Sequence, residues 1–180
     1  MAFADSVVIE LRPNETSRRE AGNPHVPYAP DEIVAQARLA ADAGATILHW
    51  HARDPASGDP IHDVDPYLEV IDAVRDEGLG LLLHPTLGYT SATAVADRVA
   101  HLVAARDRGT QVDLAPVDFG SVDVDLWDPV AGRFVPGDSS YANQRGSITA
   151  TLEAIRDLEV AGVVAVCWHP GQVRTALRFR

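Results

Sequence analysis

Two histidines separated by one residue, His49 and His51, close an apolar run and could bind a divalent metal ion. Side chains two residues apart on a strand point to the same face, so both imidazoles would lie together, with Arg53 next on that face. Two neutral imidazole nitrogens at a fixed spacing begin a zinc site, which a carboxylate or a water can complete. The alternative is one hydrogen-bonded core histidine and one surface histidine.

Short apolar strands alternate with amphipathic helices along the chain. The pattern predicts strands over 6–12, 46–53, 79–86, 111–117 and 163–168. It predicts helices over 30–43, 65–76, 91–109 and 147–161, and a last helix that begins at Pro170. Repeated strand-then-helix units imply right-handed crossovers and a parallel sheet.

Two α/β architectures fit this pattern, an open doubly wound sheet and a (β/α)8 barrel. The first crossover has no glycine-rich phosphate turn, which disfavours a dinucleotide site. Polar residues instead follow the strands at their carboxyl ends, where barrel enzymes keep their chemistry. These residues are Glu15, His49, His51, Arg53, His84, Thr86 and Asp118. We therefore predict a TIM-barrel type fold, residues 1–180 forming one partial barrel domain of about five βα units, since a typical barrel needs about 250 residues.

Composition excludes several classes of function. The 180 residues carry a formal net charge of -11, which argues against nucleic-acid or acidic-membrane binding, because both reward positive charge. No apolar stretch approaches the roughly 20 residues that span a bilayer. The chain has no lysine, which excludes a lysine Schiff base, and its single cysteine, Cys167, cannot form an internal disulfide. This cysteine usage predicts a reducing, cytoplasmic environment, and no signal peptide is apparent.

Several segments together resemble the β-keto acid cleavage enzymes, the family that includes 3-keto-5-aminohexanoate cleavage enzyme. They are Asn14-Glu15-Thr16, residues 23–27 (NPHVP), residues 30–33 (PDEI), residues 49–55 (HWHARDP) and residues 117–122 (VDFGSV). The resemblance implies a barrel fold with Zn2+, or another divalent metal, on the histidine pair and no organic prosthetic group. The implied reaction converts a small β-keto acid and acetyl-CoA, the co-substrate, into acetoacetate and a new acyl-CoA thioester.

The resemblance also implies roles for individual residues. His49 and His51 become metal ligands, and Glu15 becomes the catalytic carboxylate beside the metal, although a solvated loop acid is the alternative. Arg53 is a further catalytic candidate, although the favoured role is a structural pair with Asp54 that braces the loop holding the histidines.

Other candidates are more weakly indicated. Thr86 lies where the family places small hydroxyl residues, so we expect a catalytic and substrate-binding role, with a turn residue as the alternative. His84 is either a polar lining residue or a core histidine. Ser121 and Asn143 are candidates for contacts to substrate or CoA. The stretch between them is too long for a bare loop and suggests a hairpin, either over the barrel mouth or in an oligomer contact.

The chain also departs from the family pattern. The family's third metal ligand (a glutamate), its proton-abstracting aspartate and a substrate-binding arginine belong to a segment that is not in this sequence. Val164 and Val166 stand where a strand glutamate is common, and His169 stands where an aspartate is common.

A partial barrel would leave strand edges and an apolar inner face exposed, so we expect a homo-oligomer or a complementing chain, with impaired activity alone. Two alternatives are a noncatalytic metal-binding partial barrel or subunit, and an unrelated zinc barrel hydrolase or isomerase.

Overall fold

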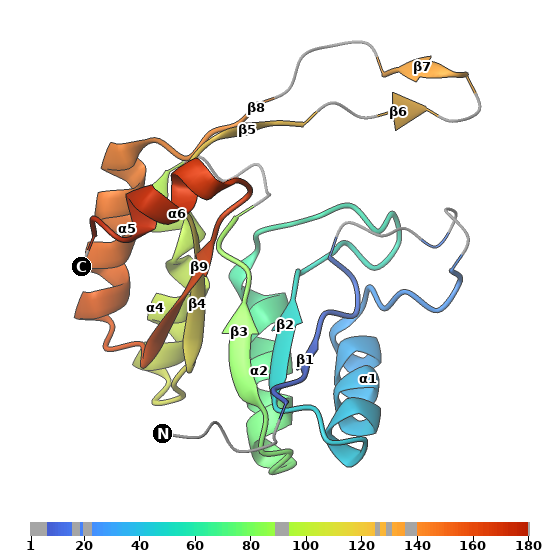
Figure 1. Cartoon of the computed structure of the whole chain (residues 1–180). Coiled ribbons are helices and arrows are strands. Elements are labelled where there is room, and N and C mark those ends of the chain that lie inside the picture. The colour runs from blue at the N-terminus through green and yellow to red at the C-terminus, as the bar shows by residue number, and fades with distance from the viewer. Residues whose placement is uncertain are drawn as a thin grey trace.

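A computed structural model describes residues 7–15, 19, 23–88, 94–124, 127–128, 131–135 and 140–179 (Figure 1). Parallel strands form its centre. They are β1 (Glu10–Leu11), β2 (Ile47–Trp50), β3 (Leu82–Pro85), β4 (Leu114–Asp118) and β9 (Gly162–Val166). Strands β1, β2 and β3 form one sheet and β4 pairs with β9 in another. The Asp113 N–H donates to the Leu83 carbonyl (3.2 Å), so the two sheets continue each other in chain order.

Helices follow the strands and cover their outer side (Figure 1). They are α1 (Pro30–Asp42), α2 (Val64–Asp76), α3 (Val95–Arg98), α4 (Ala100–Asp107), α5 (Arg145–Asp157) and α6 (Pro170–Ala176). The predicted alternation of strands and helices is confirmed, and the fold is α/β. The third predicted helix is divided at Val99, whose backbone leaves the helical region (φ -100°, ψ 1°). Ser6 and Ser91, where a strand and a helix were predicted to begin, lie outside the described residues. So does Thr16 of the segment Asn14-Glu15-Thr16.

Local chemistry explains where α1 begins and ends. Pro30 occupies the first turn, where its missing N–H is not needed. The Glu32 carboxylate accepts hydrogen bonds from the backbone N–H groups of Tyr28 (2.8 Å) and Ala29 (3.0 Å), which the helix leaves without partners. Gly44, at φ 93°, adopts the left-handed conformation that stops the helix.

Strand periodicity separates an apolar face from a polar one. Leu48, Trp50 and Leu83 are fully buried in the hydrophobic core that the strands share with the helices. His49 and His84 stand opposite each other in the parallel register of β2 and β3, on the other face. The inner face of the sheet therefore carries the chemically active side chains.

A two-stranded arm extends from the end of β4 (Figure 1). Strand β5 (Val122–Asp123) pairs with β8 (Ser140–Tyr141), and β6 (Trp127–Asp128) pairs with β7 (Arg133–Phe134), both antiparallel. The predicted hairpin is thus confirmed by these pairings, while its residues 125–126, 129–130 and 136–139 lie outside the described part of the chain.

Apolar side chains are exposed at both ends of the strand series. Val7, Val8 and Ile9 precede β1, and Val163 and Trp168 belong to or follow β9; all are at least 42% exposed. In the described residues, β1 pairs only with β2, and β9 only with β4. Each end therefore has an edge that another strand could pair with. In that same part of the chain, no helix is long and apolar enough to cross a membrane.

A buried histidine behind the sheet makes the stability of this fold depend on pH. The ring of His101 stacks on Tyr67 (4.2 Å between centroids) and meets the edge of His62 (5.4 Å). Neither ring nitrogen of His101 has a hydrogen-bond partner among the described residues. Burial, reinforced by the neighbouring His62, lowers the pKa of His101 to about 3.

We expect the free energy of unfolding to decrease as the pH is lowered from about 6.5, the pKa of histidine in the unfolded chain, to the pKa of His101 in the folded chain. For this one group the decrease is about 1.4 kcal/mol per pH unit. The reason is that the unfolded chain binds a proton there and the folded chain does not. His101→Phe should flatten that slope and raise the urea midpoint at pH 5, because it removes an unpaired buried polar ring. Urea unfolding across this range measures both effects, with the exposed His25→Phe as control. An unchanged slope in His101→Phe would contradict the assignment.

Candidate functional site

A cavity of about 580 Å³ opens at the carboxyl ends of the strands. Four predicted site residues line it together: Glu15, His49, His51 and Thr86. Arg12, His84, Asp118, Tyr141, Val166 and Trp168 also line it, as does the base of the arm at residues 122–124. Arg53, Ser121 and Asn143 are not among the described lining residues.

The two histidines of the HxH motif meet inside this cavity. Their Nε2 atoms lie 3.3 Å apart, and both rings are buried. Two nitrogens bound tetrahedrally to one zinc ion at about 2.0–2.1 Å would be separated by about 3.3–3.4 Å. One carboxylate oxygen of Glu15 lies within 4.8 Å of a ring nitrogen of each histidine. The two imidazoles therefore fit a zinc ion as they stand, and the Glu15 carboxylate would have to move closer to complete the set.

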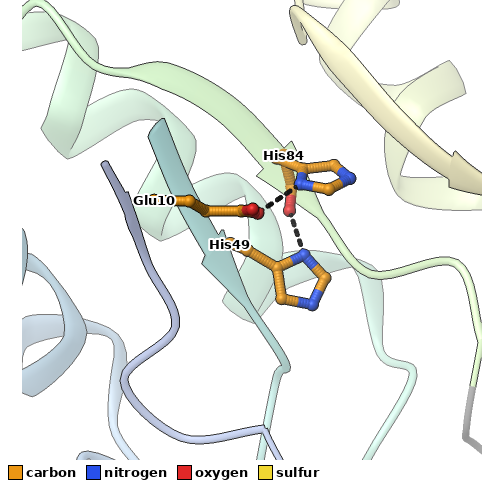
Figure 2. A group of neighbouring side chains, drawn as sticks. All are labelled: Glu10, His49 and His84. Atoms are coloured by element: carbon orange, nitrogen blue, oxygen red, sulfur yellow. Dashed lines mark hydrogen bonds and ion pairs between the residues drawn. The ribbon is translucent and has the colours of Figure 1, made fainter. Parts of the chain in front are cut away.

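Hydrogen bonding and burial prepare both rings as ligands. His49 Nδ1 donates to the carbonyl of His84 (2.8 Å), which leaves the lone pair on Nε2 (Figure 2). Burial, helped by the neighbouring His84 and Arg12, lowers the pKa of His49 to about 4. Burial, with His49 and Arg53 nearby, lowers the pKa of His51 to about 3. Both imidazoles are therefore neutral near pH 7, the form that binds a metal.

Asn14 holds the backbone of the second ligand. Its Nδ2 donates to the carbonyls of His51 (2.8 Å) and Pro27 (3.2 Å), and its Oδ1 accepts from the His51 N–H (3.1 Å). The side chain is buried. A single amide thus satisfies both backbone groups of His51 just beyond the end of β2. This fixes the direction of the ring.

A second group of potential ligands, Glu10, His49 and His84, lies beside the first (Figure 2). Glu10 Oε1 accepts from His84 Nδ1 (2.7 Å), and Glu10 Oε2 accepts from Arg12 (3.2 Å). Burial alone would raise the pKa of Glu10, but the His84 hydrogen bond and the Arg12 charge lower it. Because these atoms already bind one another, the Glu10–His84 pair is better suited to support His49 than to hold a second ion.

Arg53 binds the loops around the site. Its guanidinium donates to the carbonyls of Gly58 (2.9 Å), Asn14 (2.5 Å) and Glu15, and it lies 5.6 Å from the Tyr28 ring centroid. The side chain is buried. The Asp54 carboxylate accepts backbone hydrogen bonds from residues 56 and 57, within the same loop. This geometry matches the bracing role more closely than contact with a substrate.

The remaining candidates lie in two places. The Thr86 hydroxyl donates to the Gly88 carbonyl (3.2 Å) at the cavity wall. Ser121 Oγ accepts from the Asn143 N–H (2.9 Å), and Asn143 Oδ1 accepts from Arg98 (2.9 Å), so these two residues fasten the base of the arm. Their roles in substrate or CoA binding remain predictions.

Sequence reasoning missed Glu10, Tyr141 and Trp168. A glutamate inside the apolar run of residues 6–12 was a usable signal, because an acid on a buried face needs a partner. Tyr141 and Trp168 gave no comparable signal. Both line the cavity, where Asp118 accepts hydrogen bonds from the Tyr141 hydroxyl (2.9 Å) and from Trp168 Nε1 (2.9 Å).

Solved structures of ObcA share this fold. Its apo structure superposes with a TM-score of 0.69 at 18% identity, covering 87% of this chain and 33% of ObcA. A ternary complex of ObcA with a C4-CoA adduct and oxalate gives a TM-score of 0.68 at 19% identity.

Curated proteins are similar in sequence. A 3-dehydrocarnitine:acetyl-CoA trimethylamine transferase from Rhizobium meliloti is 30% identical over 59% of this chain and 40% of its own length. A 3,5-dioxohexanoate:acetyl-CoA acetone transferase from Paraburkholderia graminis is 30% identical over 74% of this chain and 41% of its own length. The chain thus spans about two fifths of the relatives it matches. The family model for beta-keto acid cleavage enzyme matches residues 6–180. The chain belongs to the β-keto acid cleavage enzyme family.

Proposed function

We propose that this chain carries the zinc-binding part of an enzyme that converts a β-keto acid and acetyl-CoA into acetoacetate and a new acyl-CoA. The observation that carries the proposal is the pair of neutral imidazoles with Nε2 atoms 3.3 Å apart, beside Glu15 in a cavity of about 580 Å³. Family membership supplies the reaction class, and the names of the relatives support acetyl-CoA as co-substrate.

In this proposal, different residues of the chain bind the metal, position its ligands and bind the substrate. His49, His51 and Glu15 would hold the ion, and Asn14 and the Glu10–His84 pair would keep the histidines in place. When bound, Zn2+ supplies a Lewis acid that polarises the keto carbonyl. Thr86, which lines the cavity, would hydrogen-bond the substrate, and the walls of the cavity would exclude water.

We also propose that the domain is a partial TIM barrel completed by further βα units. Five parallel strands run in chain order with helices on one side, as in the first part of a barrel. The apolar residues exposed at both edges support completion by a second copy or a complementing chain. A barrel closed in this way would bury the inner face.

A second candidate is a metal-binding partial barrel without catalytic activity. The state of Glu15 favours it: the side chain is 50% exposed and already pairs with Arg12 at 3.3 Å. A carboxylate in that setting is a weak third ligand. Activity would then require groups from another chain.

Metal content and turnover separate these functions. The purified chain should retain about one equivalent of zinc after dialysis, measured by mass spectrometry of the metal. With acetyl-CoA and a panel of β-keto acids, acetoacetate should form. Zinc without acetoacetate supports the second candidate. Hydrolysis or isomerisation of other substrates without acetoacetate would contradict the proposed reaction, and a chain that binds no zinc would refute the metal site.

A further inference from the structure

Arg12 joins two carboxylates at the wall of the large cavity. Its Nη1 donates to Glu15 Oε1 (3.3 Å), and its Nη2 donates to Glu10 Oε2 (3.2 Å). Both contacts are long, because hydrogen bonds between charged partners are typically about 2.7–2.9 Å. The side chains of Arg12 and Glu15 are 41% and 50% exposed. An exposed ion pair of this kind is weak, so the Glu15 carboxylate can leave Arg12 at little cost.

The same carboxylate is the third donor of the proposed zinc set. One of its oxygens lies within 4.8 Å of a ring nitrogen of His49 and of His51. An ion held by the two imidazoles would therefore compete with Arg12 for Glu15. Any group that takes the place of Glu15 on the guanidinium would favour completion of the metal site.

Arg12 has donors left for such a group. A guanidinium carries five N–H groups in a planar fork, and the contacts with Glu10 and Glu15 use two of them. The side chain lines the cavity, so a ligand there can reach the fork. A carboxylate that meets the fork with both oxygens makes two parallel hydrogen bonds, whereas Glu15 makes one. A carboxylate ligand can therefore displace Glu15.

The opposite wall of the cavity does not offer a carboxylate the same setting. Asp118 and Asp123, at the ends of β4 and β5, line that wall. Arg98 belongs to an adjoining cavity of about 20 Å³, which Asp118 also lines, and it donates to Asn143 Oδ1 (2.9 Å). Two carboxylates and one guanidinium leave this wall with a net negative charge. Among the described residues that line the large cavity, Arg12 is the one permanent cation.

A metal ion decides whether the Arg12 side attracts a carboxylate. Arg12, Glu10 and Glu15 together carry one positive and two negative charges, a net charge of -1. A divalent ion on the neutral histidine pair changes this local charge to +1, while the opposite wall stays negative. A carboxylate is then drawn to Arg12 and repelled from Asp118 and Asp123.

We propose that Arg12 binds the carboxylate of the keto acid and thereby releases Glu15 to the metal, so that zinc and substrate each increase the affinity for the other. This inference rests on the proposed function, because the ligand is the β-keto acid of that reaction. It gives a reason for the contact between Arg12 and the carboxylate beside the histidine pair: the third donor is held back until a substrate arrives. Coupling between two ligands is reciprocal, so it can be measured from the side of zinc.

Two ligands that differ in charge test the coupling. One is 3-hydroxybutyrate, which has a hydroxyl where a β-keto acid has its carbonyl, and the other is its uncharged amide, 3-hydroxybutyramide. Competition against a fluorescent chelator measures the zinc affinity of the full chain with each ligand, corrected for the zinc that the ligand binds by itself. The acid should raise the zinc affinity about threefold to fivefold, the range of an exposed ion pair, and the amide should leave it unchanged.

Variants assign the effect to Arg12. Arg12→Gln should raise the zinc affinity without any ligand by a similar factor, because it frees Glu15, and it should abolish the response to the acid. Arg38→Gln, which removes an equal charge from an exposed pair with Glu77, should change neither quantity. In a chain that also carries Glu15→Gln, the gain from Arg12→Gln should shrink, because no carboxylate is left to release.

Three results would overturn the proposal. The first is an equal zinc affinity with the acid and the amide, a comparison that needs no variant and so holds even if Arg12→Gln fails to fold. The second is a response to the acid that persists in Arg12→Gln, because the carboxylate would then bind the ion directly. The third is an equal gain from Arg12→Gln with and without Glu15, because Arg12 would then act by charge alone.

The same measurements keep this inference apart from the proposed function. A chain that forms acetoacetate but shows no coupling would retain the function and lose the role of Arg12. A coupled response without acetoacetate would retain the role of Arg12 and refute the reaction. A chain that binds no zinc would refute the metal site and the coupling together.

Discussion

Replacing His51 by alanine is expected to abolish tight zinc binding while the chain remains folded. The His51 Nε2 is one of two nitrogens placed 3.3 Å apart, and its loss leaves His49 and an exposed Glu15 as the remaining donors. Loss of a ligand should lower affinity by more than the roughly 10–100-fold that follows loss of a supporting residue. Competition against a fluorescent chelator measures this affinity.

Two further variants assign the ion to one of the two neighbouring groups. Glu10→Gln removes the carboxylate that binds His84 but leaves His49, His51 and Glu15 intact. Glu10→Gln should lower the zinc affinity by about 100-fold at most, as expected for a residue that supports a ligand without binding the metal. The exposed His25→Ala should have no effect. Zinc affinity that survives in His51→Ala and collapses in Glu10→Gln would place the ion at Glu10 and His84 instead.

The parts of the site that lie close together in sequence could be predicted from it. His49 and His51 share a face because strand periodicity fixes the direction of every second side chain. The same reasoning located the start of α1 at Pro30 and its end before Gly44, since capping chemistry is local. Periodicity fails where the strand ends. β2 stops at Trp50, so Arg53 leaves the face on which the pattern had placed it.

Contacts between distant segments could not be predicted in this way. Glu10 binds His84 across 74 positions of sequence, and Trp168 binds Asp118 across 50. No local rule pairs such residues; they meet because consecutive parallel strands bring their carboxyl ends to one edge. The sequence pattern shows that polar residues gather at that edge. The packed sheet decides which of them touch.

Arg53→Met should destabilise the metal-free chain by about 3 kcal/mol or more, because three carbonyls lose a charged donor and unsatisfied buried acceptors cost about 1–3 kcal/mol each. The acceptors belong to Asn14, Glu15 and Gly58, and Arg53 is only 1% exposed. Arg53→Lys should recover part of the loss, since lysine keeps the charge but not the planar fork. The urea midpoint of the metal-free chain measures the effect.

A comparison with an exposed arginine decides between bracing and catalysis for Arg53. Arg38→Met removes an equal charge from a side chain that is 51% exposed and pairs with Glu77, so its effect should stay below about 1 kcal/mol. If Arg53 braces the loop that carries Asn14 and Glu15, its replacement lowers stability and zinc affinity together, because Asn14 orients His51. If Arg53→Met instead keeps its stability and its zinc affinity and loses only turnover, Arg53 acts on the substrate. The buried fork on three backbone carbonyls favours the first result, because a guanidinium used in this way has few donors left for a ligand.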